Sequence, residues 1–521
     1  MADKKETPRL FAAIDVGSFE LCMKIFEISS RGMRQIEYIR QRLALGTDSY
    51  VSKKISLPKM EELFRILQEF KDVMRSYHIK EYRAYGTSAL RETENTEILL
   101  DQIRNRSGIK LDILSNSEQR FLDYKAIAAS GKQFDEIIAE GTAIVDIGGG
   151  SIQLSLFDKG RLVITQSLKL GVLRLLERLT AIKPRTSQIE AVLDEMIDGQ
   201  LQVFRKMYLK EREVKNLIVM DDYLSAHFRK AVAGTNEKNV VKAEDFLRFV
   251  AAIAPEGNEE VAERLEVPEE SVPMIKISAG IMKRVVRSFS AEALWAPGAT
   301  LCDGIAYEYA ESRHLKTAAR DFEEDILACA STISKRYMGS RKRAVAMEQI
   351  ALAIFDGMKK VHGMGERERL LLRLSAILHD CGKFINLTNV GDCSYSIIMN
   401  TEMIGLSHLE REMVASVVKF NHEDFEYFED LSAHSDISEE AYLTIAKLTA
   451  ILRIANALDK SQKQKVKEIS AVMREDRLLL TVDSGADLLF EQERVRARAD
   501  FFEEVYGIRP EIVTAQWHKS S

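Results

Sequence analysis

The sequence lacks most features that mark secreted, membrane-embedded or nucleic-acid-coating proteins. Its 521 residues include only five cysteines, scattered without paired spacing, which is typical of a reducing compartment. Residues 1–9 are polar and charged rather than a signal peptide, and no uninterrupted apolar run is long enough to span a bilayer. The net charge of −6 argues against wholesale coating of nucleic acid. We therefore expect a cytoplasmic protein with no membrane partner and no sequence-specific nucleic-acid partner.

The composition is otherwise that of an ordinary globular protein. Hydrophobic residues make up 46% of the chain and charged residues 30%. A chain of this length can form several domains with sizeable cores. No low-complexity segment or long flexible linker is present.

The stretch with the clearest chemical signature, residues 143–151, reads AIVDIGGGS. The apolar run predicts a buried strand, and the three glycines allow a tight turn close to a ligand. Consecutive amides in such a turn can bind an anion, while Asp146 is suited to hold magnesium or a water molecule. Residues 152–157 alternate as a second strand, so the stretch is a hairpin. It is not a P-loop, because the lysine and the following helix are missing; a plain glycine-rich hairpin is the alternative.

The same pattern occurs near the N-terminus. Residues 11–18 read FAAIDVGS, and another apolar strand follows at 21–26. A strand, an Asp-x-Gly turn, a serine and a second strand thus recur about 130 residues apart, which indicates an internal repeat. Two such halves could place both turns across one cleft.

Two further stretches offer groups that suit a phosphate. Thr87 and Ser88 begin a helix, where hydroxyls cap the helix and can bind an anion, and Arg91 lies one turn further on. Glu118 falls in the first turn of a helix after Ser115, where its charge suits the helix dipole. An ordinary capped helix explains the first stretch, and a capping glutamate explains the second. In the functional interpretation Glu118 is a general base that orients water at a phosphorus atom.

These stretches together resemble the exopolyphosphatase and guanosine pentaphosphate phosphatase (Ppx/GppA) family of the actin-like ATPase superfamily. Four motifs carry the resemblance, in the family's order and spacing: 15–18, 87–95, 115–118 and 146–151. The resemblance implies an α/β fold with two ribonuclease-H-like lobes around a phosphate cleft. The implied domains are an actin-like lobe at 1–125, a second at 126–310, an all-α HD-like domain at 311–462 and a small α/β domain at 463–521.

The resemblance also implies an activity, the magnesium-dependent removal of terminal phosphate from polyphosphate or pppGpp. In that scheme Glu118 activates the attacking water and Asp146 helps to position Mg²⁺. The residues that would hold phosphates are Asp15, Gly17, Ser18, Thr87, Ser88, Arg91, Gly148, Gly149, Gly150, Ser151 and Gln153. Phosphoryl transfer needs mainly positioning and charge neutralisation, which such a set can supply.

Residues 376–383 read AILHDCGK and resemble the metal motif of HD-type phosphohydrolases, with His379 and Asp380 as ligands. A working site needs further ligands from other helices. The family pattern puts a histidine near Arg343 and an aspartate at Asn456, so both positions lack the ligand. Two other ligand types lie nearby in sequence: His362 and Asp459. The sequence therefore favours a structural helical domain over a functional metal site.

Several residues depart from the family's pattern in ways that bear on activity: Phe19, Asn116, Gln119, Gln153, Asp221 and Asp222. An amide such as Gln153 cannot take a proton or hold a metal as a carboxylate would. Two aspartates at 221–222 would repel a polyanion where the family has bare amides. Each lost charge-assisted hydrogen bond costs roughly 1.5–3 kcal/mol.

These departures favour an alternative, a sensor of the same fold that binds polyphosphate or guanosine tetra- or pentaphosphate without hydrolysing it. A sugar kinase of the same superfamily is a third, weaker interpretation, because the motif set follows the phosphatases. The predicted partner in either main case is polyphosphate or a guanosine polyphosphate. The sequence leaves the oligomeric state open, a homodimer included.

Overall fold

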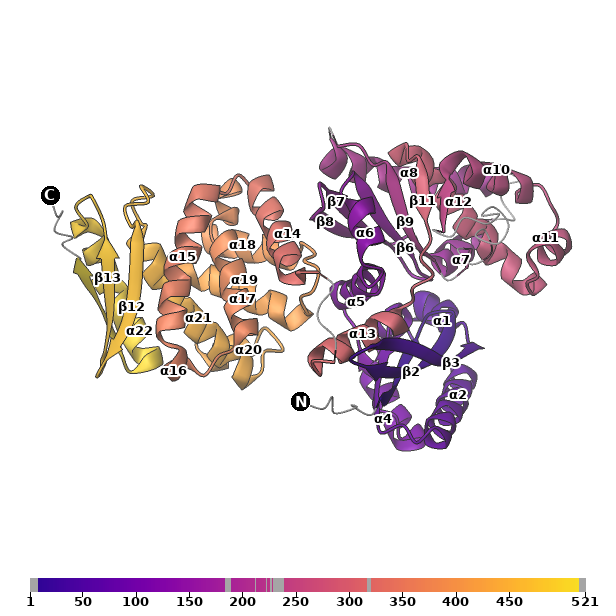
Figure 1. The fold of residues 1–521 in the computed structure, drawn as a ribbon, viewed down its shortest axis with the longest axis horizontal. Helices are drawn as coiled ribbons and strands as arrows, with labels where there is room; N and C mark the ends of the chain where they lie inside the picture. Colours follow the sequence, from indigo (N-terminus) through magenta and orange to yellow (C-terminus); the bar gives the residue numbers. More distant parts are fainter. Residues whose placement is uncertain are drawn as a thin grey trace. The chain divides into compact units, whose positions relative to one another are not determined.

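The computed structural model describes residues 8–182, 189–210, 212–221, 223–224, 227, 239–315 and 320–514. The chain divides into two compact units, Met1–Asp321 and Phe322–Ser521. Figure 1 colours the first unit from indigo through magenta to salmon-red and the second from salmon through orange to yellow.

Unit 1 begins with a five-stranded sheet in the order β3-β2-β1-β4-β5. The central strand β1 (Arg9–Val16) pairs antiparallel with β2 (Glu20–Ser29) and parallel with β4 (Glu81–Gly86). The outer strands are β3 (Gly32–Arg42) and β5 (Asp112–Ile113). The helices of this part are α1 (Leu45–Ser52), α2 (Leu57–Ser76), α3 (Ser88–Arg91), α4 (Thr96–Ser107) and α5 (Asn116–Ala128). The next helix, α6 (Lys132–Ile138), packs on the second sheet, where Phe134 contacts Phe157 of the second hairpin.

The second sheet of unit 1 repeats this topology. Its order is β10-β11-β9-β6-β7-β8, and β6 (Thr142–Ile147) pairs antiparallel with β7 (Ile152–Asp158) and parallel with β9 (Asn216–Asp221). The outer strands are β8 (Arg161–Leu168), β11 (Ala293–Trp295) and β10 (Val240–Lys242). The helices are α7 (Val172–Ile182), α8 (Ile189–Phe204), α10 (Ala243–Ile253), α11 (Asn258–Leu265) and α12 (Val272–Phe289). From β8 to β11 the order matches that from β3 to β5, so the two-lobe fold predicted from the repeat is confirmed.

The two lobes also share the register of their first hairpins. Asp15 pairs with Cys22 in the first lobe, and Asp146 pairs with Gln153 at the same place in the second. Alternate residues of β1 face two separate cores, with Ala12 and Ile14 on one side and Phe11 on the other. Both faces of the strand are buried, which explains its unbroken apolar sequence.

Helix α13 (Leu301–Ser312) packs on the first lobe, beside α5, although the sequence division placed residues 301–310 in the second (Figure 1). The ring of Tyr309 stacks on Phe11 with centroids 4.0 Å apart. Lys24 Nζ lies 2.8 Å from Asp303 Oδ2. The apolar face of this helix therefore completes the core beneath β1.

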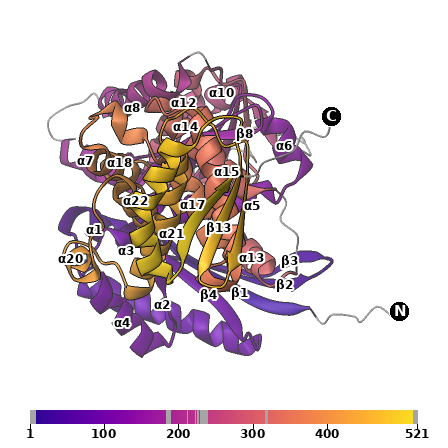
Figure 2. The same ribbon diagram turned by 90° about the vertical axis from the view of Figure 1, so that its left-hand side faces the viewer.

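Unit 2 begins with a helical part and ends in a small sheet. Its helices are α14 (Phe322–Arg336), α15 (Arg341–Gly357), α16 (Lys359–His362), α17 (Glu366–Leu378), α18 (Val390–Met399), α19 (His408–His422), α20 (Phe428–Ser432) and α21 (Glu439–Leu458). The tail comprises β12 (Glu468–Arg474), β13 (Arg477–Asp483), α22 (Leu489–Tyr506) and β14 (Arg509–Thr514), in yellow in Figure 2. Within the unit α22 packs on α21 and β12 packs on α15.

Helix α21 is long and apolar enough to cross a membrane by composition alone. Within unit 2, however, 78% of its most apolar window is buried. Its residues Ile445, Leu448 and Leu452 are fully buried. Its hydropathy is therefore accounted for by its place in the core of this unit.

Candidate functional site

The two predicted phosphate turns have the same backbone geometry. In the first, the amide of Gly17 donates to the carbonyl of Glu20 at 3.0 Å, and in the second the amide of Gly148 donates to that of Ser151 at 3.0 Å. Within the described ranges, the amides of Gly149 and Gly150 have no backbone acceptor. They are therefore available to an anion.

The carbonyls of the glycine turn are held from the other side by α7. The amides of Val172 and Leu173 donate to the carbonyls of Gly148 and Gly149, each at 3.0 Å. A Cβ at Gly171 would overlap the backbone of this turn, so the close approach requires glycine there. The first turn of α7 thus fixes the orientation of the peptide groups that carry the amides of Gly149 and Gly150.

The two turns face each other, as the repeat predicted. A Cβ at Gly149 would lie 2.9 Å from the Cβ of Ser18, and one at Gly150 would overlap Ser88 Oγ at the start of α3. The turns after β1 and β6 and the start of α3 therefore meet at one point.

A tyrosine that the sequence analysis did not single out lies at this point. Tyr50 OH lies 2.6 Å from Ser18 Oγ and donates to Ser88 Oγ at 2.9 Å. It comes from α1, which carries no motif of its own. Tyr50 belongs to the site because the glycine turn of the second lobe packs against its hydroxyl.

Three half-buried carboxyl groups lie near the ends of strands β1, β6 and β9. Burial, together with Glu20 and Asp146, raises the pKa of Asp15 to about 7. Burial likewise raises the pKa of Asp146 to about 7, although Arg120 opposes the rise. Burial raises the pKa of Asp221 to about 6, although hydrogen bonds from Ser278 and two backbone amides oppose it. Groups with strongly shifted pKa values cluster at functional sites, so these acids mark a candidate site.

These acids allow a test of whether the site suits magnesium. Oδ1 of Asp15 is buried without a hydrogen-bond partner, and Asp146 is close enough to raise its pKa. Within the described part of the chain, no group of three or more His, Cys, Asp or Glu side chains is placed to hold a metal by itself. Mg²⁺ usually takes one or two carboxylates and completes its shell with water and phosphate. Asp15 and Asp146 fit that pattern.

Asp221 does not present a free charge to the glycine turn. Its Oδ1 accepts from the amide of Tyr223 at 2.7 Å, and its Oδ2 accepts from Ser278 Oγ at 2.6 Å. The predicted repulsion of a polyanion is therefore weakened here by hydrogen bonding and a raised pKa. Asp222 lies outside the described residues.

Besides Ser18 and Ser88, three more of the predicted phosphate-binding side chains are engaged by protein groups. Arg91 bonds the carbonyl of Leu114 and donates to Asn116 Oδ1 at 2.6 Å. Gln153 Oε1 accepts from Nε of the buried Arg120 at 2.7 Å. The third, Thr87, donates through Oγ1 to the carbonyl of the residue that ends β1, at 3.4 Å.

Glu118 forms the helix cap that the sequence analysis gave as its structural alternative. The amide of Ser115 donates to Glu118 Oε2 at 2.9 Å, and Ser115 Oγ accepts from the amide of Glu118 at 3.3 Å. This reciprocal capping box fixes the start of α5 and the position of the carboxylate.

Comparison with known proteins agrees with this architecture. Residues 24–313 match the model of the Ppx/GppA phosphatase family, and residues 328–497 match its domain III. The chain belongs to the Ppx/GppA phosphatase family.

Relatives of this Ppx/GppA protein extend over nearly its whole length. A guanosine-5'-triphosphate,3'-diphosphate pyrophosphatase of Photobacterium profundum is 22% identical over 495 residues, which cover 91% of this chain and 92% of that one. The corresponding protein of Aeromonas hydrophila is 22% identical and covers 93% of this chain and 96% of its own. The crystal structure of an exopolyphosphatase from Cytophaga hutchinsonii aligns with a TM-score of 0.52 at 18% identity, over 59% of this chain and 100% of that chain, so the two share a fold there.

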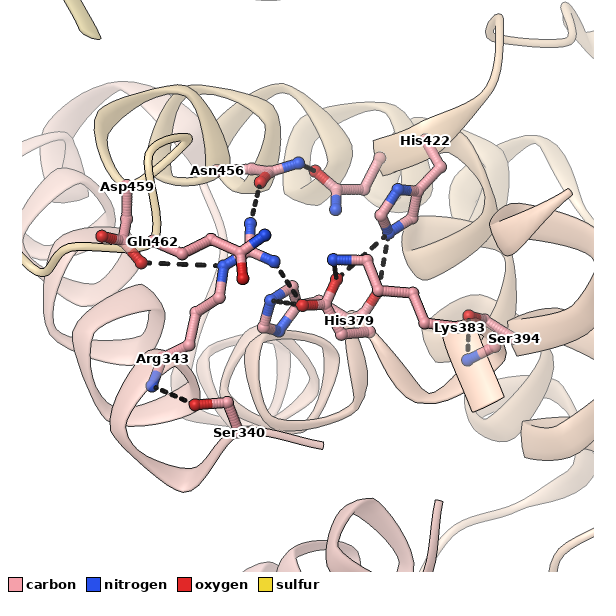
Figure 3. A network of polar contacts seen from close by, with 12 residues as sticks. Ser340, Arg343, His379, Lys383, Ser394, His422, Asn456, Asp459 and Gln462 are labelled. Carbon is pink, nitrogen blue, oxygen red and sulfur yellow. Dashed lines mark hydrogen bonds and ion pairs between the residues drawn. The ribbon is translucent and has the colours of Figure 1, made fainter. Parts of the chain in front are cut away.

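In unit 2 of this family member, the residues around the predicted metal motif form a buried polar network (Figure 3). The guanidinium of Arg343, which is 2% exposed, bonds Asp380 and donates to Asn456 Oδ1 at 2.8 Å. Its Nε lies 3.6 Å from Asp459 Oδ2. His379 Nε2 lies 3.2 Å from Asp380 Oδ2. Of the two positions that lack a family ligand, Arg343 contacts Asp380 directly and brings a cation, whereas Asn456 is joined to Asp380 through the Arg343 guanidinium.

The geometry does not support a metal at His379 and Asp380. Lys383 Nζ lies 2.8 Å from Asp380 Oδ1, so both carboxylate oxygens contact cationic groups. Burial would raise the pKa of Asp380, but His379, Arg343 and Lys383 hold it well below its usual range. His362, offered above as a nearby ligand type, instead hydrogen-bonds the carbonyl of Phe355 through Nε2.

Proposed function

We propose that this member of the Ppx/GppA family is a phosphohydrolase that removes terminal phosphate from pppGpp or polyphosphate with Mg²⁺. The observation that carries the proposal is the meeting of two repeated turns and the start of α3 beside Asp15 and Asp146, whose pKa values are raised. The names of the relatives support the same substrate class: one is a pyrophosphatase for guanosine-5'-triphosphate,3'-diphosphate and another an exopolyphosphatase.

In the proposed scheme the amides of Gly149 and Gly150 bind oxygens of the terminal phosphate. The hydroxyls of Ser18 and Ser88 donate to the same group from the first lobe. Asp15 and Asp146 would hold Mg²⁺, which when bound neutralises charge on the phosphates. Since the pKa of Asp146 is raised to about 7, metal binding at neutral pH releases a proton from this pair.

Glu118 is the proposed general base. Its Oε2 caps α5 through the amide of Ser115, which holds the carboxylate in one position. A water oxygen attacks the terminal phosphorus, its proton passes to Glu118, and the bridging oxygen leaves with the shortened chain. Removing a general base typically slows such a step by about 10²–10⁴-fold.

A second function is favoured by specific contacts. Arg91 is bonded by Asn116, Gln153 by Arg120, and Tyr50 fills the meeting point of the turns. Each contact replaces one that a phosphate would make. The alternative is therefore a sensor that binds the same anions with little or no turnover.

The experiment compares Glu118→Gln with Ser115→Ala. The amide of Gln can still accept from the Ser115 amide, so Glu118→Gln removes basicity and keeps the cap. Ser115→Ala removes the other half of the capping box, at about 1 kcal/mol, and leaves the carboxylate. With Mg²⁺ present, we expect phosphate release to fall about 10²–10⁴-fold in Glu118→Gln only.

The two variants separate the outcomes. Tripolyphosphate affinity should be kept or improved in Glu118→Gln, because one negative charge leaves an anion site. Equal rates in wild type and Glu118→Gln, or equal losses in both variants, would contradict the catalytic role. Tight binding without turnover in wild type would favour the sensor.

A further inference from the structure

Tyr50 lies where a bound phosphate is expected. Its hydroxyl contacts Ser18 Oγ at 2.6 Å and Ser88 Oγ at 2.9 Å, which are the two hydroxyls proposed above to bind a phosphate. A Cβ at Gly150 would overlap the same phenol oxygen, so this oxygen also lies against the glycine turn. One neutral hydroxyl thus touches all three segments of the anion site.

The phenol is held there by a second set of contacts. The guanidinium carbon of Arg174 lies 4.4 Å from the centre of the Tyr50 ring. Arg174 also donates from Nε to the carbonyl of Gly150 at 3.0 Å and pairs with Glu92 at 2.7 Å. Burial raises the pKa of Tyr50, so the phenol is neutral at physiological pH. Arg174 therefore links the ring, the glycine turn and the segment after α3.

We propose that Tyr50 competes with phosphate for the anion site, so that any phosphate bound by Ser18, Ser88 and the glycine turn together must first displace the phenol. The inference rests on the proposed anion site. It adds a positioning residue that sets how tightly that site holds its ligand. The described conformation is then the form that binds anions least well.

The effect of Tyr50 on phosphate affinity depends on the contacts that are lost when the phenol is displaced. Two hydrogen bonds are lost, each worth a factor of roughly two to ten in an equilibrium constant. The apparent affinity of a ligand is reduced by the fraction of molecules in the open form. Because Tyr50 must leave the site before any such ligand binds, it lowers the affinity for each ligand by the same factor.

The test measures binding of tripolyphosphate and of orthophosphate to the full chain by calorimetry. Tyr50→Ala removes the competitor and Tyr50→Phe removes only its hydroxyl. Tyr77→Phe is the matched control, since that hydroxyl donates to Glu37 at 3.0 Å in the same lobe but away from the turns. We expect binding to tighten about tenfold or more in Tyr50→Ala, by an intermediate factor in Tyr50→Phe and not in the control. Both anions should shift by the same factor.

A second measurement uses the unmodified protein, so the result does not depend on how well a variant folds. Hydrogen exchange of residues 45–52 should become faster when saturating tripolyphosphate displaces Tyr50. Binding that stays within twofold or weakens in Tyr50→Ala, or exchange at 45–52 that stays unchanged, would overturn the competition while leaving the anion site in place. Failure of tripolyphosphate to bind either wild type or Tyr50→Ala would overturn the proposed function and this inference together.

Discussion

The guanidinium of Arg343 is the centre of the buried network in unit 2, and its removal should destabilise that unit strongly. Arg343→Met keeps a long unbranched side chain but removes the charge. The carboxylates of Asp380 and Asp459, whose side chains are 11% and 1% exposed, then lose a cationic neighbour. Breaking a buried pair by removing one partner costs about 3–5 kcal/mol.

The contacts that remain place the expected cost near the lower limit. Asp380 keeps Lys383 at 2.8 Å and His379 at 3.2 Å, so its charge is not left alone. We therefore expect a loss of about 3 kcal/mol. For a unit of about 200 residues this lowers the melting temperature by about 6–12 °C.

Differential scanning calorimetry of the full chain measures the effect, with Arg369→Met as the control. Arg369 pairs with Asp356 in the same unit, but the Asp356 side chain is 53% exposed, so this loss should be within about 1 kcal/mol. Arg343→Met with Asp459→Asn should recover part of the stability, because the second change removes the carboxylate that has lost its cationic neighbour. A melting temperature within 1 °C of wild type in Arg343→Met, or no recovery in the double variant, would refute the reasoning.

Two further variants test His379 of the metal motif and the carboxyl group of Asp221. His379→Ala should leave phosphate release unchanged, because the side chain contacts Asp380 and the carbonyl of Ala376 rather than the anion site; a transition metal found by elemental analysis and lost in this variant would contradict that. The pKa of Asp221 is raised to about 6, above its ordinary value of 3.8, so the folded state holds a proton that the unfolded state releases, and wild-type stability should fall as pH rises from about 4 to 6. Asp221→Asn removes this loss and should raise the free energy of unfolding by about 3 kcal/mol at pH 8 but not at pH 4. Urea titrations at both pH values measure it, and an equal effect at the two would show that the titration of Asp221 is not its cause.

Much of the fold follows from the sequence because it depends on short-range patterns. The buried strand at 143–147 and its glycine turn form a hairpin whose hydrogen bonds and register lie within residues 142–157. The repeat at 11–18 has the same local chemistry and therefore the same hairpin. The capping box of Ser115 and Glu118 likewise depends on only four consecutive residues.

Which side chains come together in the site depends on contacts between residues far apart in the chain. Tyr50 reaches Ser88 within the first lobe, and it reaches the glycine turn only because the second lobe packs against the first. Nothing in its own helix indicates that place. Arg343 contacts Asn456, which lies 113 positions further along the chain. The family pattern predicted only that a metal ligand is missing at Arg343, and not that its guanidinium bonds Asp380.

The sequence by itself thus determined the two-lobe core, its paired turns and the helical part that follows. Only the tertiary structure decided which polar groups those turns and helices would face. The physical reason is that a strand or a tight turn is stabilised by its own backbone and its apolar pattern. A buried charge or hydroxyl, by contrast, is stabilised by whichever partner packing brings to it.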